Sequence, residues 1–392
     1  MKHHLKGFLP ALALAFPLNL IAAAPVSDNG PEADLQHVFE SIERKDLSGA
    51  LARTEAITKA YPNFRLAHLI KGDLLLARAR PISTFGNVSG DEAQVEDLRE
   101  EAIARLRAYR DKPGADYVPR YLLQMGPEQE YAVVVDTRRA RLYVYRNDHG
   151  TPRFVADFYA SHGRAGAEKR TEGDMRTPIG VYHVVSQIDG GKLPPLYGDG
   201  AFPINYPNEW DKRHGRTGYG IWLHGVPYDT YSRPPRTSQG CVVLANQDFN
   251  ALSNYVQVGL TPVIISNEIE WLSLDDWRHE RSALNAAIES WRTDWESRNV
   301  DRYLSHYARS FKSDDQTLAQ WEERKRAIGT GKTWIEVKLD QMSMLLSPGR
   351  EGVVEVTFMQ SYKSNNYTDA SRKRQYWIKE GGKWRIAYEG GA

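Results

Sequence analysis

Apolar residues recur three or four positions apart through much of the first third of the chain. Three runs with this spacing cover residues 35–42, 51–61 and 66–74. Polar breaks separate the runs, and a more charged stretch with similar spacing follows at residues 91–109. Such spacing places apolar side chains on one face of a helix. The pattern therefore predicts a helical N-terminal region, which we assign to residues 24–126.

The pattern changes at Tyr131, from which apolar and polar residues tend to alternate. "YAVVVDTRRARLYVYRND" predicts two strands around a turn at Thr137–Arg139, because a period of two is typical of half-buried strands. Further strand-like runs are "RFVADFYASHG", "TPIGVYHVVSQI" and "LTPVIISN". A mostly β domain is therefore predicted over residues 127–268.

Helical spacing returns after Asp276. The apolar stripe consists of Leu284, Ala287, Ile288, Trp291 and Trp295, and Tyr303 and Tyr307 are predicted to extend the same helix. The polar "RKRAIGTGKT" is predicted to be a loop, and three strand-like runs follow it, the last with a hairpin turn at Gly381 and Gly382. We expect the core to contain Trp291, Trp334, Trp377 and Trp384. Residues 269–392 are therefore predicted to be an α+β domain.

The first residues have the layout of a secretory signal peptide. Lys2 and Lys6 precede an apolar run that ends in small residues at Ala23, and Pro10 and Pro17 interrupt that run. We predict a signal peptide over residues 1–23, with an uncleaved anchor as the alternative. No second long apolar segment follows. The mature chain is expected to be periplasmic or otherwise exported, with no integral membrane segment.

Charge and cysteine content narrow the class of function. Lys+Arg 51 against Asp+Glu 50 gives a net charge of +1, so no overall field favours nucleic acid. Cys241 is the one cysteine, and it cannot form a disulfide within the chain. An unpaired thiol in an oxidising compartment is a liability. Cys241 is therefore either a deeply buried packing residue or a residue with a chemical task.

The surroundings of Cys241 favour a chemical task. A thiol attacks as thiolate and needs a neighbouring base or positive charge. His224 lies 17 positions earlier, at the end of the predicted strand in "IWLHGVPYD". Gly240 permits a tight turn and leaves space for a substrate beside the sulfur. The N–H groups of Gly240 and Cys241 are candidate donors to an oxyanion.

His224-Gly225 followed by Ser238-Gln239-Gly240-Cys241 resembles the signature of the L,D-transpeptidase catalytic domain, and "EGDMRTPIGVYHV" resembles a second segment of that family. The resemblance covers about 140 residues and implies acyl transfer on peptidoglycan stem peptides. Cys241 would form a thioester with diaminopimelate and expel D-alanine. His224 would move the protons, with its ring oriented by the Gly225 carbonyl.

Two positions depart from the family pattern. Gln239 stands where a second histidine is usual, and Val243 stands where many members have an arginine. Carboxylate recognition must then come from elsewhere. We predict substrate contacts by Ser238, Gln239, Arg233 and Arg236, although a solvated surface position is the alternative for each arginine.

The regions on either side of the predicted catalytic domain resemble other known domains. The N-terminal helices resemble one tetratricopeptide-type unit or a plain helical packing domain, and the last domain resembles the nuclear-transport-factor-like cone. This order of domains resembles the L,D-carboxypeptidases of curved or helical bacteria. The sequence leaves the second half of the reaction open: it could be transfer to an amine, hydrolysis, or an amidase reaction that releases lipoprotein from peptidoglycan. A non-catalytic peptidoglycan-binding scaffold is the alternative from another class.

Partners and cofactors follow from these resemblances. We expect peptidoglycan stem peptides as the partner of the catalytic domain, and a protein or glycan as a possible partner of the C-terminal domain. The histidines at positions 162, 183, 214 and 224 fit no compact ligand spacing, so no metal site is predicted. The predicted chemistry requires no cofactor.

Overall fold

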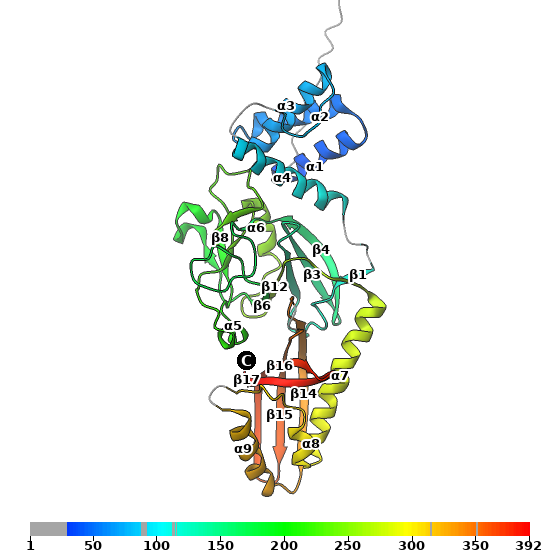
Figure 1. Ribbon diagram of the computed structural model, residues 1–392, viewed down its shortest axis with the longest axis vertical. Helices are drawn as coiled ribbons and strands as arrows, with labels where there is room; N and C mark the ends of the chain where they lie inside the picture. Colours follow the sequence, from blue (N-terminus) through cyan, green and yellow to red (C-terminus); the bar gives the residue numbers. More distant parts are fainter. Residues whose placement is uncertain (1–29, 88–91, 112–113, 115, 314–315, 350–351) are drawn as a thin grey trace, which may run out of the picture.

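The computed structural model describes residues 30–87, 92–111, 114, 116–313, 316–349 and 352–392. These residues form an elongated molecule in which helices, a β-rich part and a second part with strands and helices follow one another along the long axis (Figure 1). The predicted signal peptide, residues 1–23, lies outside the described residues. Within the described ranges, no helix is both long and apolar enough to cross a bilayer.

The N-terminal region is helical, as predicted. Its helices are α1 (Gly30–Glu43), α2 (Leu47–Ala60), α3 (Arg65–Ala79) and α4 (Glu92–Arg110). The predicted stripes meet in one core, to which Leu35, Val38, Leu51, Ile57, Leu66, Ile70 and Leu74 contribute. Asp46 begins α2 by accepting a hydrogen bond from the Gly49 N–H (2.8 Å).

The next part contains a mixed sheet. Among the described residues its strand order is β4-β3-β2-β12-β6. The strands are β2 (Tyr131–Asp136), β3 (Arg141–Asp148), β4 (Thr151–Tyr159), β6 (Gly180–His183) and β12 (Pro262–Ser266). Strand β2 is buried on both faces, with Val133 and Val135 in one apolar cluster and Ala132 and Val134 in another. This sheet therefore separates two cores.

A second sheet packs on the Val133 face and carries the residues of interest. Its order is β11-β9-β8-β7. The elements are β7 (Ile188–Asp189), β8 (Gly200–Pro203), β9 (Trp222–His224), β11 (Val242–Val243) and, beside them, α6 (Asn246–Ser253). Phe202, Leu223, Val242 and Phe249 fill the space between the sheets. The predominantly β character of this part is as predicted.

The other face of the first sheet packs on the C-terminal part. Helix α7 (Leu274–Glu296) places Leu284, Ile288 and Trp291 in the cluster that contains Val134. Residues 117–126 lie at the same junction, because β1 (Tyr117–Pro119) pairs with β13 (Trp271–Ser273). The two parts thus share one apolar core.

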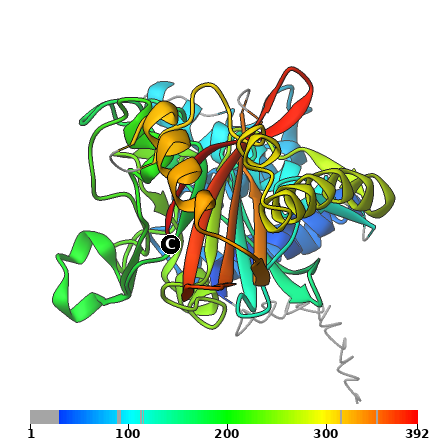
Figure 2. The same ribbon diagram turned by 90° about the horizontal axis from the view of Figure 1, so that it is seen from below.

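The C-terminal sheet has the order β14-β15-β16-β17 in the described residues, with antiparallel neighbours. The strands are β14 (Ile335–Leu346), β15 (Val354–Ser364), β16 (Tyr367–Glu380) and β17 (Lys383–Gly391). The predicted hairpin turn lies between β16 and β17, where Gly381 and Gly382 have φ of 60° and 77°. Figure 2 shows this sheet from below, with helices at its sides. The α+β prediction is confirmed.

Three sequence-based expectations for this part are wrong. Tyr303 and Tyr307 do not extend α7, because Arg298 adopts a left-handed φ of 62° and Asn299 caps the new helix α8 (Val300–Leu304). Most of the predicted loop "RKRAIGTGKT" is helical and belongs to α9 (Leu318–Thr330), which begins with a capping box. Trp334 is 47% exposed and is not a core residue.

Candidate active site

His224 is the last residue of β9, and Cys241 directly precedes the neighbouring strand β11. Strand β11 pairs in parallel with β9, with Val242 opposite Leu223 and Val243 opposite His224. Leu223 and Val242 are fully buried between the sheets. Because successive side chains of a strand alternate between faces, His224 points to the face opposite Leu223. The pairing therefore places the segment that follows Cys241 beside the end of β9 that carries His224.

The hydrogen bond of His224 fixes its tautomer. Its Nδ1 lies 2.6 Å from the Gly225 carbonyl oxygen, which can only accept. The proton must then be on Nδ1, and Nε2 carries the free lone pair. The ring also packs edge-on against Tyr197, with centroids 4.9 Å apart. His224 is thus held in the form that can accept a proton at Nε2.

Asn246 holds the turn after His224, and sequence reasoning did not single it out. Its Oδ1 accepts from the N–H groups of Val226 (3.0 Å) and Asp199 (3.3 Å), and its Nδ2 donates to the Val226 carbonyl (2.8 Å). A Cβ on Gly225 would lie 2.3 Å from Asn246 Oδ1, so a larger residue there would displace this amide. The turn that carries the Gly225 carbonyl is therefore built around one amide side chain.

A compact loop presents Cys241. Gly240 has φ of +127°, and a Cβ there would lie 2.7 Å from the Arg176 carbonyl oxygen. The Gly240 N–H donates to Ser238 Oγ (3.0 Å), whose hydroxyl donates to the Cys241 carbonyl (2.6 Å). The Cys241 thiol donates to the Gly220 carbonyl (3.4 Å). In this conformation, the Gly240 N–H predicted for the oxyanion is engaged within the loop.

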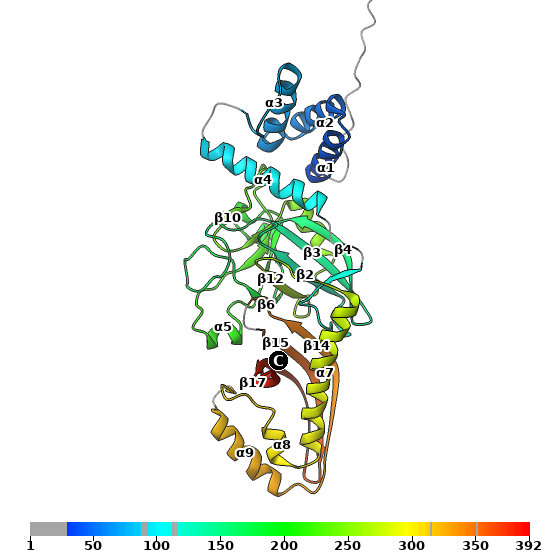
Figure 3. The same cartoon turned by 45° about the vertical axis from the view of Figure 1, so that its right-hand side comes forward.

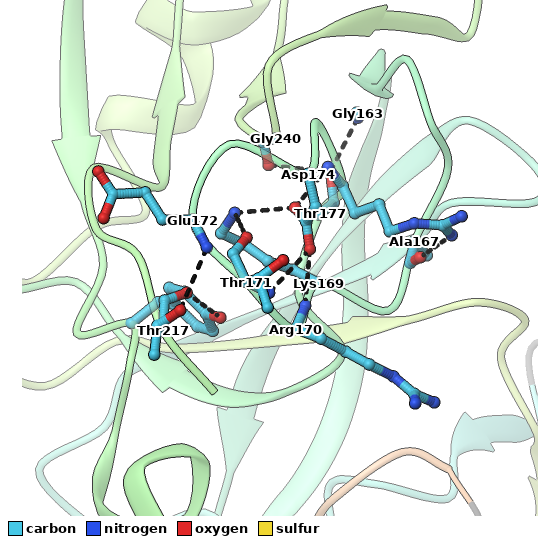
Figure 4. A network of polar contacts seen from close by, with 12 residues as sticks. Gly163, Ala167, Lys169, Arg170, Thr171, Glu172, Asp174, Thr177, Thr217 and Gly240 are labelled. Atoms are coloured by element: carbon cyan, nitrogen blue, oxygen red, sulfur yellow. Dashed lines mark hydrogen bonds and ion pairs between the residues drawn. The ribbon is translucent and has the colours of Figure 1, made fainter. Parts of the chain in front are cut away.

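The "EGDMRTP" segment belongs to a network of polar contacts that reaches Gly240 (Figure 4). Asp174 accepts from the N–H groups of residues 170, 171 and 176 and from Lys169 Nζ (2.9 Å), and these hydrogen bonds lower the pKa of Asp174 to about 2. Thr177 donates to the Gly240 carbonyl (2.9 Å). The segment thereby contacts the cysteine loop directly and places the buried Lys169 near it.

Burial sets the resting protonation of the pair. It raises the pKa of the Cys241 thiol to about 11, although the Trp222 backbone N–H and the charge of Lys169 oppose this shift. Burial also lowers the pKa of His224 to about 4, against the effect of its bond to Gly225. Both groups are then neutral at pH 7. The imidazole would have to take the thiol proton during an attack rather than beforehand.

The other predicted substrate contacts lie elsewhere or are already engaged. Arg233 is buried and donates from Nη1 to the Val243 carbonyl (2.7 Å). Arg236 forms an ion pair with Glu100 of α4 (2.5 Å). Gln239 is exposed at the tip of the cysteine loop. Substrate binding by Ser238, Gln239 and the two arginines stays a prediction.

Replacement of Lys169 by methionine is expected to raise the pKa of Cys241. The variant removes a cation that favours the thiolate and leaves the Asp174 carboxylate without its partner. At fixed pH the rate of alkylation of Cys241 by iodoacetamide should fall several-fold. Arg170→Met is the matched control, because its side chain is 79% exposed. Equal alkylation rates in the two variants would contradict the effect.

Comparisons with known proteins identify two domains. Residues 130–265 match the L,D-transpeptidase catalytic domain, and residues 283–390 match the Cds6 C-terminal NTF2-like domain. Bd1075 from Bdellovibrio bacteriovorus has a similar structure with 29% identity and a TM-score of 0.64, covering 71% of this chain and 98% of its own. Helices α1–α4 precede both matched ranges.

A second solved structure is also similar to this chain. The helical cell shape determining protein Pgp2 from Campylobacter jejuni is 26% identical with a TM-score of 0.59, and the match covers 69% of this chain and 95% of Pgp2. A comparison with curated proteins gives no match.

Proposed function

Because this chain combines an L,D-transpeptidase catalytic domain with an NTF2-like domain, we propose that it is an exported cysteine enzyme of peptidoglycan remodelling. The substrate is the tetrapeptide stem, in which the enzyme cleaves the bond between the L-centre of diaminopimelate and D-alanine. The observation that carries the proposal is the pairing of β11, which begins directly after Cys241, with β9, which ends at His224. The Gly225 carbonyl holds the Nδ1 proton of His224 and so supports the proposed role of Nε2 as a base.

The first half of the reaction forms a thioester. Cys241 Sγ attacks the diaminopimelate carbonyl while His224 Nε2 takes the thiol proton. Negative charge develops on the carbonyl oxygen, which requires backbone N–H donors near the cysteine. When the intermediate collapses, the C–N bond breaks and His224 returns the proton to the nitrogen of D-alanine. D-alanine leaves as a free amine.

The second half resolves the thioester. Water or an amine attacks the same carbonyl, His224 accepts a proton from it, and the C–S bond breaks with return of that proton to the sulfur. We propose water as the main acceptor, because the order of domains resembles that of the L,D-carboxypeptidases of curved or helical bacteria. The product is then a tripeptide stem. Transfer to the amine of a second stem is the alternative outcome.

Mass spectrometry of purified muropeptides tests the function. The mature chain is incubated with disaccharide tetrapeptides alone and with added tripeptide acceptor. Tripeptides with equimolar D-alanine support the carboxypeptidase reaction, whereas dimers joined through two diaminopimelate residues support transpeptidation. A substrate carrying a lipoprotein-derived lysine tests the amidase alternative. No product from any of these would favour the scaffold alternative and overturn the proposal.

The C-terminal domain contains a cavity that suits a polymer substrate. Its volume is about 890 Å³, and Trp295, Trp321, Tyr362, Lys325 and Glu389 are among the lining residues. The Lys325 ammonium lies 4.3 Å from the Trp321 ring centroid. Aromatic faces beside a cation suit a sugar ring with an acidic substituent. We propose glycan rather than protein as the partner of this domain.

Loss of the Lys325 charge is expected to weaken binding to intact sacculi. In Lys325→Met, roughly tenfold weaker co-sedimentation is expected, because a charge-assisted contact is lost. Turnover of soluble disaccharide tetrapeptide should stay near that of the wild type. The control is Lys338→Met, whose side chain is 67% exposed in the same domain. Unchanged sedimentation of the Lys325 variant would exclude the cavity as the binding site.

A further inference from the structure

The loop that joins the two predicted catalytic residues contacts the N-terminal helices. Within this loop, Tyr231 packs on Tyr61 with ring centroids 5.1 Å apart and on Phe64 at 6.1 Å. Tyr61 and Phe64 bound the short turn between α2 and α3. The ring of Tyr231 thereby joins the apolar core of the helical region. This part of the loop is inserted into another structural unit rather than exposed to solvent.

The same loop completes helix α3. The first N–H groups of a helix need an acceptor outside the helix, and serine is among the preferred N-cap residues. Phe64 occupies the N-cap position of α3 and provides no side-chain acceptor. Ser232 provides it instead, because its Oγ accepts a hydrogen bond from the Leu66 N–H (2.8 Å). The helix and the loop therefore stabilise each other.

Helix α4 and the adjoining Tyr159 hold Arg233 and Arg236, the next residues of the loop, through charge and aromatic contacts. It lies between the other helices and the β-rich part (Figure 3). Arg236 pairs with Glu100 (2.5 Å), and Arg105 stacks 4.0 Å over the ring of Tyr159. The hydroxyl of Tyr159 donates to the Arg233 carbonyl (2.6 Å). Arg233 is thereby fixed between α4 and the sheet.

Arg233 connects these contacts to the reacting groups. Its Nη1 donates to the carbonyl of Val243, which is the residue opposite His224 in the β11–β9 pairing. Val243 lies two residues after Cys241. A displacement of the loop would therefore shift the strand pairing that sets the distance between Cys241 and His224.

We propose that α3, α4 and the α2–α3 turn are a positioning element of the active site, which holds residues 226–237 as a fixed wall beside Cys241 and His224. The helices lie outside both matched domains. The contacts described are incompatible with a freely moving lid. The proposal concerns the geometry of the site and holds for any substrate.

Tyr231→Ala in the full-length mature chain tests the proposal, with Tyr228→Ala as the matched control. Tyr228 belongs to the same loop but is 70% exposed. Amide hydrogen exchange over residues 226–240 should become roughly tenfold faster in Tyr231→Ala only. Loosening of the loop should also make the sulfur more accessible to iodoacetamide, so alkylation of Cys241 should accelerate. Turnover should fall through kcat, with KM little changed.

A second pair of variants separates the cap from general destabilisation. Ser232→Ala removes the acceptor for Leu66, whereas Ser232→Thr keeps a hydroxyl. Faster exchange in the alanine variant and restoration by threonine, at similar melting temperatures, would support the proposal. Wild-type exchange and alkylation in both Tyr231→Ala and Ser232→Ala would overturn it. Exchange and alkylation need no substrate, so this result is independent of the proposed peptidoglycan reaction.

Discussion

Cys241→Ala is expected to abolish release of D-alanine from tetrapeptide stems, with a loss of roughly 10⁴-fold or more in kcat. Alanine has no nucleophile, so the thioester cannot form and the remaining site can only bind the stem. In the wild type, acid quenching during turnover should trap a protein whose mass is raised by the acyl group on Cys241. The same quench of the variant should give the unmodified mass.

The variant should remain folded, which makes the loss interpretable. The thiol donates a hydrogen bond to the Gly220 carbonyl, and its neighbours are held independently of it: the Gly240 carbonyl accepts from the Thr177 hydroxyl, and Val242 pairs with Leu223. Cys241→Ser is the closer control, because it keeps a donor toward Gly220 while its hydroxyl is a much weaker nucleophile. Wild-type rates of D-alanine release by folded Cys241→Ala would mean that cleavage does not pass through Cys241.

His224→Gln is expected to lower kcat/KM by roughly 10²- to 10⁴-fold. The glutamine amide can still donate to the Gly225 carbonyl, but it cannot take the thiol proton or return it to the leaving amine. The remaining reaction would depend on the small thiolate fraction of a group with pKa about 11. Its rate should therefore rise steadily with pH.

The pH profile of the wild type gives a second test. The pKa of His224 is about 4, so the imidazole is protonated and inactive as a base below that pH and free above it. The value of kcat/KM should rise as pH increases through about 4 and then stay level through neutrality. An activity that first appeared between pH 6 and 7 would contradict a buried, neutral His224 in the resting site.

A second histidine separates catalysis from folding in these measurements. Burial also lowers the pKa of His162 to about 4, but its strand β5 (His162–Gly163) pairs with β10 (Arg236–Ser238) rather than with β9. His162→Gln should lose less stability than the wild type as the pH falls toward 4, because the variant has no buried imidazole to protonate. The rise of its kcat/KM near pH 4 should be unchanged. Loss of that rise in His162→Gln instead would mean that the profile reports unfolding.

Local patterns in the sequence predicted most of the fold. Alternation over "YAVVVDTRRARLYVYRND" gave the β2–β3 hairpin, and Gly381-Gly382 gave the last turn, because each depends on neighbours in sequence. Helix α9 was missed because most of its residues are polar and few apolar ones, such as Leu318 and Trp321, face the core. Its start also depends on the capping box at Thr317. Long-range partners decided the remaining differences.

In the candidate site, too, the features that depend on neighbours in sequence could be predicted, and those that depend on distant residues could not. The spacing of His224, Gly225 and Cys241 was readable because one loop carries the motif. The roles of Asn246 and Ser232 were not, since each side chain caps or bridges backbone that lies elsewhere in the chain, 166 residues away for Ser232 and Leu66. Two arginines in a loop likewise look like substrate ligands until Arg236 is seen to pair with Glu100 of α4 and Arg233 to donate to the Val243 carbonyl.

Because β2 is buried on both faces, the catalytic domain cannot be separated from the C-terminal domain without exposing an apolar surface. Ala132 and Val134 face α7 and the C-terminal strands, so a shortened gene that ended after β12 would encode a catalytic sheet with a bare apolar side. Such a fragment is expected to aggregate through this face. Substitutions in α7 and the C-terminal strands that disturb the shared core are therefore expected to destabilise the catalytic domain as well.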